Sequence, residues 1–235
     1  MNEEQNKINL TTTPDEWMTI DRKSEKSDTS SKPQEVVKKV WEKFDYNSPV
    51  ILTFAVMSFV VLLLGMLTQM ASTRLLFAVY RTSFIDPLFY IRLFGHTLGH
   101  ANLTHYFNNF LIILLVGPVL EEKYGWKKML IMIVSTSLII GILHAAVSNE
   151  TMLLGASGVA FMFIILNSYV NLKEGRIPIT LILCVALFMG REIANQIRAD
   201  DYDNISHFSH IIGGLCGAGF GYWINRDKIK GAAQN

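Results

Sequence analysis

The chain has 235 residues with 21 Lys or Arg and 20 Asp or Glu, so its formal net charge is only +1. Eighteen of these charged side chains lie in residues 1–45, and the rest of the chain is far more apolar than its mean hydropathy of +0.29 indicates. No basic patch stands out, which disfavours a nucleic-acid-binding protein. Cys184 and Cys216 both lie in apolar runs and are interpreted as core residues, which argues against a secreted disulfide scaffold.

Residues 1–45 are polar and rich in Ser and Thr, with too few apolar residues to fold alone, so we expect a disordered cytoplasmic tail. Near the end of this tail, residues 34–46 carry apolar side chains at helical spacing, namely Val36, Val37, Val40, Trp41 and Phe44. This pattern predicts either a short helix at the membrane interface or an extension of the first span.

Six apolar segments follow within residues 46–227. Their approximate bounds are 49–70, 102–120, 129–147, 155–171, 177–190 and 205–224. About 20 helical residues cross a hydrocarbon core of about 30 Å, so the fourth and fifth segments are short. Short spans are tolerated inside a bundle or beside a water-filled cavity. The sequence therefore predicts an all-α membrane protein, a bundle of six transmembrane helices.

A long connection of about 30 residues joins the first two segments. It is rich in Leu, Phe and Tyr but is interrupted by Arg81, Asp86, Pro87 and Arg92. Such a segment is too apolar for water and too charged to span, so we expect it to lie at the membrane interface.

The distribution of Lys and Arg predicts the orientation. Sixteen of them fall in the tail, the 121–128 loop, the 172–176 loop and the C-terminal segment, and five fall in the opposite loops. The positive-inside rule then places both termini in the cytoplasm, including a short C-terminal segment at 228–235. The bare six-span core favours a bacterial plasma membrane.

All six histidines lie within or beside apolar spans, where ionisable groups are costly to bury and are candidates for function. His105 and Asn109 are four residues apart and share a helix face. His96 and His100 have the same spacing at the outer end of that span. His144 is interpreted as a local hydrogen-bonding group.

Two glycine-rich motifs lie on later spans. Ser157 sits in Gly155-Ala156-Ser157-Gly158, which is either ordinary helix-packing sequence or a nucleophile site. His210 precedes Gly213, Gly217 and Gly221, which form a smooth face for a neighbouring helix. A hydroxyl, a histidine base and polar donors are the parts of acyl-transfer chemistry. No intramembrane carboxylate is available to orient His210, so a Ser–His dyad is predicted.

With these motifs in this order, residues 92–217 resemble the rhomboid family of intramembrane serine proteases. The matching positions are Arg92 in the interfacial loop, His100, His105 and Asn109 on the second span, Glu121 to Gly125 after it, Gly155 to Gly158, and His210, Gly213 and Gly217 on the sixth span. The resemblance implies a six-helix bundle with a long interfacial loop between the first two helices.

The resemblance also implies roles for individual residues. Ser157 would be the nucleophile and His210 its general base, in a water-filled cavity open to the outside. The oxyanion would be held by His105, Asn109 and the backbone N–H of Ser157, with the N–H of Ala156 in addition. Supporting positions are Arg92, His100, Glu121, Gly155, Phe161, Gly213 and Gly217. The expected substrates are transmembrane proteins in the lipid bilayer, and no metal or cofactor is expected.

The sequence departs from the family pattern at three positions. Ile91 replaces a Trp beside Arg92, and Phe161 stands where many bacterial members have a Tyr that stacks on the catalytic histidine. His207 is an additional imidazole that competes with His210 for the role of base, but it lacks the glycines at the following turns.

Three other functions remain open at this point: a histidine-rich membrane metalloenzyme, a catalytically inactive relative that binds membrane clients, and a transporter with a proton relay. The zinc-protease signature His-Glu-x-x-His is absent from the sequence. The sequence does not specify the substrate, the role of the tail or the oligomeric state.

Overall fold

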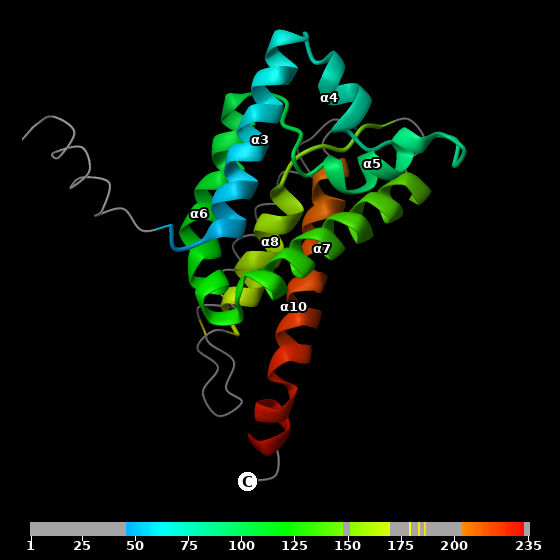
Figure 1. The fold of residues 1–235 in the computed structure, drawn as a ribbon. Helices are drawn as coiled ribbons and strands as arrows, with labels where there is room; N and C mark the ends of the chain where they lie inside the picture. The colour runs from blue at the N-terminus through cyan, green and yellow to red at the C-terminus, as the bar shows by residue number, and fades with distance from the viewer. Residues whose placement is uncertain are drawn as a thin grey trace, which may run out of the picture. The chain divides into compact units, whose positions relative to one another are not determined.

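The structure is a computed structural model that describes residues 46–147, 151–169, 179, 183, 186 and 204–232. The described residues form helices and one isolated antiparallel bridge between Val79 and Leu153. The helices are α3 (Pro49–Leu67), α4 (Ala71–Leu76), α5 (Pro87–Gly95), α6 (Leu103–Tyr124), α7 (Trp126–Val147), α8 (Ser157–Asn167) and α10 (Asn204–Ala232) (Figure 1). The expected tail and most of the expected fifth span lie outside the described residues.

Three of the described helices, α3, α6 and α7, are long and apolar enough to cross a membrane, and α8 is apolar but has 11 residues. Their outer faces carry exposed apolar side chains such as Leu67, Leu115 and Ile131, which are 81%, 68% and 63% exposed. Exposed apolar surface on this scale is typical of a surface in contact with lipid. The chain is therefore a multi-pass membrane protein.

The helix α10 covers the range predicted for the sixth span but is not among those three helices. Its sequence is interrupted by six glycines and by His207 and His210, which lowers its hydropathy. The predicted number of six spans thus remains a prediction.

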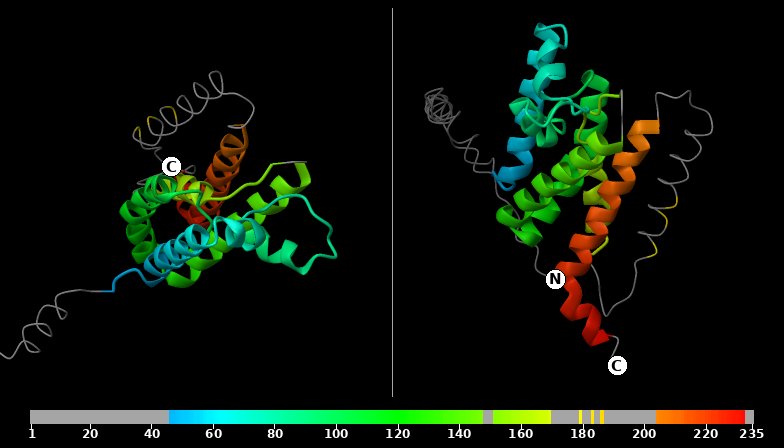
Figure 2. Two further views of the ribbon diagram at one scale, coloured as in Figure 1. Left: turned by 90° about the horizontal axis from the view of Figure 1, so that it is seen from above. Right: turned by 90° about the vertical axis from the view of Figure 1, so that its right-hand side faces the viewer.

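The short helix α8 is the centre of the bundle. It packs against α6, α7 and α10, and α3 packs against α6 and α7 on the other side (Figures 1 and 2). The main core cluster joins these helices through large buried side chains that include Phe110, Met129, Met162 and Phe163. A residue at the start of α8 is consequently held by several helices at once.

The connection between α3 and α6 contains α4 and α5, which the sequence analysis did not predict. Asp86 and Pro87 were interpreted as interruptions, but they start α5. The Asp86 side chain accepts a hydrogen bond from the Leu88 N–H (2.9 Å), and Pro87 occupies the first helical turn. An acidic N-cap followed by Pro is a favourable helix start, because Pro lacks the N–H that would be unsatisfied there.

Other boundaries differ from the predicted ones by a few residues. α3 ends at Leu67 because Gln69 and Met70 adopt φ values of 52° and 67°, which stop the helix. α6 continues to Tyr124 and α7 begins at Trp126, with Gly125 between them at φ 82°. α8 begins at Ser157 rather than Gly155, since Gly155 has φ 124° and cannot be helical.

Candidate functional site

Ser157 is the first residue of α8, and the chain before it is fixed at two points. Leu153 exchanges two backbone hydrogen bonds of 2.9 Å with Val79, and the Gly155 N–H donates to the His96 carbonyl oxygen at 2.8 Å. Both partners lie in the long connection between α3 and α6. That connection therefore sets the position of the segment that leads to Ser157.

Ser157 also differs from its neighbours in exposure. Within residues 155–163 it is the one residue that is not buried. As the first residue of α8, it has an N–H that points out of the helix without an intrahelical acceptor. The N-terminal end of a helix carries a partial positive charge, so this end favours an anion.

His105 and Asn109 lie directly beside Gly155. A Cβ atom at Gly155 would stand 2.7 Å from His105 Nε2 and 3.5 Å from Asn109 Nδ2. The predicted pair on one face of the second span is thus brought to within two residues of Ser157. Glycine is required at position 155 for two reasons, because its φ lies in the left-handed region and because a side chain would displace His105.

The side chains of His105 and Asn109 present donors at this point. The Ala101 N–H donates to His105 Nδ1 at 3.5 Å, which leaves Nε2 as the protonated nitrogen of the neutral ring. Asn109 is 7% exposed, and its Nδ2 has no hydrogen-bond partner in the described part of the chain. A buried amide donor without an acceptor is unusual in a native structure and calls for an explanation.

His210 approaches from α10 and is buried. Its imidazole stacks on the ring of Phe161, one helical turn after Ser157, with ring centroids 4.2 Å apart and planes 10° from parallel. Phe161 thus makes the contact expected of it although it lacks a hydroxyl. The side chain of His207 lies outside the described residues, so its competition with His210 stays open.

Glycines bring α8 and α10 into backbone contact next to this pair. A Cβ at Gly213 would lie 2.0 Å from the Gly158 carbonyl oxygen, and one at Gly217 would lie 2.4 Å from the Met162 carbonyl oxygen. The predicted smooth face is confirmed, since these contacts leave no space for a methyl group. The contact at Gly158 and Gly213 fixes Ser157 and His210 relative to each other.

His96 and His100 are not on the second span but in the connection between α5 and α6. His96 Nε2 lies 3.1 Å from the Ser137 carbonyl oxygen, and burial lowers the pKa of His96 to about 4. Burial also lowers the pKa of His100 to about 4, and its ring contacts those of His105, Tyr106 and Phe110. Both rings are neutral at physiological pH, and His100 packs behind His105.

Arg92 and Glu121 make contacts that stabilise the helix bundle, and not contacts with the proposed reacting groups. Arg92 is buried, donates from Nε to the Leu75 carbonyl oxygen (2.8 Å), pairs with Asp86 (3.0 Å) and lies over the Tyr80 ring. Both oxygens of Glu121 accept backbone N–H bonds from the first turn of α3, at 2.9 and 3.0 Å. The local bond expected for His144 is confirmed by its contact with the Thr151 carbonyl oxygen at 3.0 Å.

Sequence reasoning missed two contributors to the site. The His96 carbonyl oxygen holds Gly155 through the backbone, and backbone acceptors leave no signal in side-chain identity. Asn102 caps α6 by accepting a hydrogen bond from the His105 N–H at 2.8 Å. An Asn just before an apolar run is an ordinary helix-start signal, so this second contribution was recognisable.

In the described ranges, no three His, Cys, Asp or Glu side chains gather as metal ligands.

Comparison with known proteins bears on the family of the chain. Residues 88–227 match the Rhomboid domain family. The chain is also similar to Rhomboid-related protein 1 of Caenorhabditis elegans, with 33% identity over 144 residues, which are 56% of this chain and 39% of that protein. The chain thus matches well under half of its relative's length. Because the family match covers more than half of the present sequence, the chain belongs to the rhomboid family.

Proposed function

We propose that the protein is an intramembrane serine endopeptidase with six transmembrane helices, which cleaves transmembrane proteins through a Ser157–His210 dyad. The observation that supports this most is the environment of Ser157 at the start of α8. Ser157 is partly exposed within a buried run, and the buried Asn109 amide without a partner in the described residues lies beside Gly155, two residues before it. A family known for this chemistry, together with these residues, favours proteolysis over the metal and transporter alternatives.

In the first half of the reaction, the Ser157 hydroxyl attacks the carbonyl carbon of the scissile peptide bond while the His210 imidazole takes the hydroxyl proton. The resulting tetrahedral intermediate collapses, and the leaving amine receives the proton from His210. The product at this stage is an acyl ester on Ser157. The stacked Phe161 ring holds the imidazole in a fixed plane, which reduces the freedom it has to lose in the transition state.

In the second half, water attacks the ester carbonyl, and His210 first accepts and then returns a proton. This step regenerates the Ser157 hydroxyl and releases the new carboxyl end of the substrate. It requires water at the start of α8, in keeping with the partial exposure of Ser157 and the expected cavity open to the outside.

The negative oxygen of both intermediates needs fixed donors. His105 Nε2–H, Asn109 Nδ2–H and the Ser157 N–H at the start of α8 are the proposed donors, with the Ala156 N–H as a further one. Donors already in place cost no reorganisation when charge develops, so they stabilise the transition state more than the substrate. In this proposal, the Asn109 amide has no acceptor in the described residues because its acceptor is the oxyanion that forms during the reaction.

The proposed setting follows from the charge distribution and the family. Both termini would face the cytoplasm of a bacterium, and substrates would be cut near the outer leaflet of the plasma membrane. An inactive rhomboid that binds membrane clients is the other candidate, because the name of the relative, Rhomboid-related protein 1, states no activity.

Labelling with a fluorophosphonate probe separates these two functions. An activated Ser157 is expected to react covalently with the probe in the wild type, and Ser157→Ala is expected to remove the label. Ser135→Ala is a matched control, because Ser135 lies on α7 and its hydroxyl is bonded to its own helix. Absence of labelling in folded wild-type protein would favour the client-binding function.

A further inference from the structure

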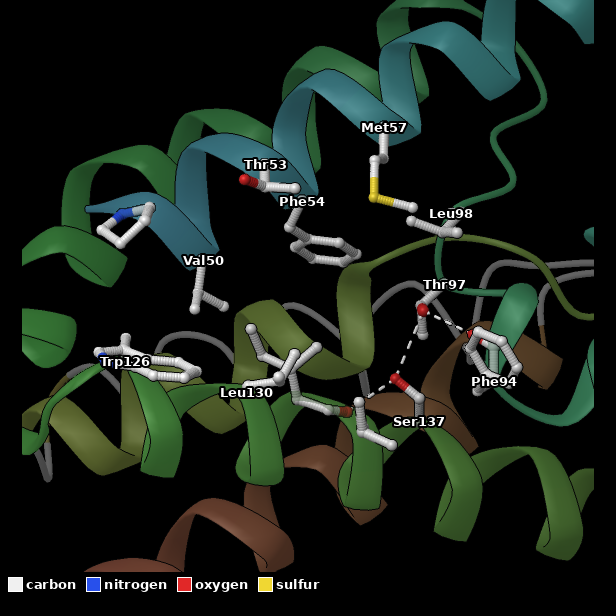
Figure 3. Close-up of a pocket in the computed structure, with 13 residues that line it drawn as sticks. Val50, Thr53, Phe54, Met57, Phe94, Thr97, Leu98, Trp126, Leu130 and Ser137 are labelled. Atoms are coloured by element: carbon white, nitrogen blue, oxygen red, sulfur yellow. Dashed lines mark hydrogen bonds between the residues drawn. The ribbon is translucent and has the colours of Figure 1, made fainter. Parts of the chain in front are cut away.

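An apolar cavity of about 510 Å³ lies between α3 and α7, on the other side of the bundle from the α8–α10 contact. We name it the α3–α7 groove; it is lined by Pro49, Val50, Thr53, Phe54, Met57, Phe94, Thr97, Leu98, Trp126, Leu130, Ile133, Val134 and Ser137. Figure 3 shows side chains from α3 facing those of α7 across it, with Trp126 at one end and Phe94 and Thr97 at the other.

The interior of the α3–α7 groove is suited to a hydrocarbon chain. Of its three hydroxyl groups, two are bonded as follows: Thr97 Oγ1 donates to the Phe94 carbonyl oxygen and Ser137 Oγ donates to the Ile133 carbonyl oxygen, both at 2.8 Å. Thr53 also makes an interaction within the protein, so an apolar occupant leaves these three residues with their partners. Burial of the remaining apolar lining is favourable.

The length of the groove matches one leaflet of a bilayer. Along α7 it extends from Trp126 to Ser137, which is about 16 Å at 1.5 Å per residue. Half of a hydrocarbon core of about 30 Å is about 15 Å. The groove thus begins at the first residue of α7 and extends along half of that helix, with Phe94 and Thr97 at its other end.

The open end of the groove is basic. Trp126 is 53% exposed there, as is typical of the membrane interface, and Lys127 Nζ lies 5.5 Å from the centre of its ring. Lys128 is the next residue and is also exposed, but the helical rotation of about 100° per residue directs it to the opposite side of α7 from the groove. The Lys127 ammonium group is placed to meet an anionic headgroup at the mouth of a groove that holds its acyl chain.

From these features we infer that the α3–α7 groove binds one anionic phospholipid, with an acyl chain along α7 and the headgroup at Lys127. The closed end of the groove is formed by the connection that carries His96, whose carbonyl oxygen holds Gly155. A bound lipid thus stabilises this connection, and the connection in turn positions the segment before Ser157. The inference rests on the membrane-embedded fold and not on the proposed proteolysis.

Native mass spectrometry of the full-length protein released from micelles tests this inference. On titration with palmitoyl-oleoyl phosphatidylglycerol, we expect one saturable adduct, and about fivefold weaker retention of phosphatidylcholine with the same chains. Val134→Trp fills the groove and is expected to remove the adduct. Leu115→Trp places the same ring on the outer face of α6 and is expected to keep it.

A second variant avoids any change in packing. Lys127→Ala alters one exposed side chain and is expected to abolish the preference for phosphatidylglycerol while one adduct remains, whereas Lys128→Ala on the opposite side of α7 is expected to keep it. The lipid is also expected to raise the thermal midpoint of the wild type and not that of Val134→Trp. Equal retention of both lipids by the wild type would overturn the inference, as would an adduct that survives Val134→Trp or a protein dimer in place of the adduct.

Discussion

The ring of Phe161 lies parallel to the imidazole of His210, with their centroids 4.2 Å apart. The two residues come from α8 and α10, whose backbones touch at Gly158 and Gly213. A histidine that is stacked in this way has a fixed plane, so its ring nitrogens have fixed directions. Phe161 is thus a positioning residue for the proposed base.

Phe161→Ala removes the stacking surface and is expected to lower kcat about tenfold, because aromatic stacking contributes about 0.5 to 1.5 kcal/mol. KM should change little, since Phe161 is buried behind His210 and not placed to hold substrate. Phe161→Tyr keeps the ring and is expected to retain activity. Steady-state kinetics on a model transmembrane substrate measure both constants, and a wild-type kcat in Phe161→Ala would contradict this role.

Asn109→Ala removes one proposed oxyanion donor. We expect kcat to fall by about 10- to 100-fold, less than the hundred- to thousandfold typical of a lost donor, because His105 and the Ser157 N–H remain. Asn108→Ala is the matched control, since this neighbouring amide is exposed on another face of α6. Equal rates for the two variants would remove Asn109 from the oxyanion site.

Gly213→Ala is expected to destabilise the protein by about 1 to 3 kcal/mol, as overpacking does, because the new methyl group would meet the Gly158 carbonyl oxygen. Gly219→Ala tests the same change on the same helix at a position with no atom within 4 Å. There the higher helix propensity of Ala favours the folded state slightly. Thermal unfolding in detergent compares them, and an unchanged midpoint for Gly213→Ala would contradict the close contact.

Glu121→Ala leaves two first-turn N–H groups of α3 without acceptors and is expected to cost about 2 kcal/mol. Ser48, the residue at the helix N-cap, makes no side-chain cap of its own, so nothing nearby replaces the carboxylate. Glu122→Ala removes an exposed carboxylate one residue away and should leave stability nearly unchanged. Similar losses in both variants, measured as free energies of unfolding, would count against the capping role.

The helices were largely predictable because long apolar runs with few charges leave few alternatives to a membrane helix. The ends of α3, α6 and α7 fall within four residues of the predicted bounds. The start of α8 just after Gly155 was harder to predict. Gly155 has a left-handed φ and lies in close contact with His105, and the local sequence does not specify that contact. The helix α5 was missed although Asp86 and Pro87 form a recognisable start.

The side chains of the candidate site were recognisable from the sequence, but the contacts that support them were not. His105, Asn109 and Ser157 are polar residues in an apolar sequence, which marks them as candidates. The capping of α3 by Glu121 joins residues about 70 positions apart, and no local pattern indicates such a partner. The α3–α7 groove was missed for the same reason, since it depends on how two helices cross.

The most direct test of the account is cleavage of a single-span model substrate by the purified protein in lipid vesicles, with and without a metal chelator. The wild type is expected to cut in both conditions, Ser157→Ala and His210→Ala are expected to cut nothing, and His207→Ala is expected to keep most of the activity. Cleavage at the normal rate by Ser157→Ala would contradict the proposed mechanism.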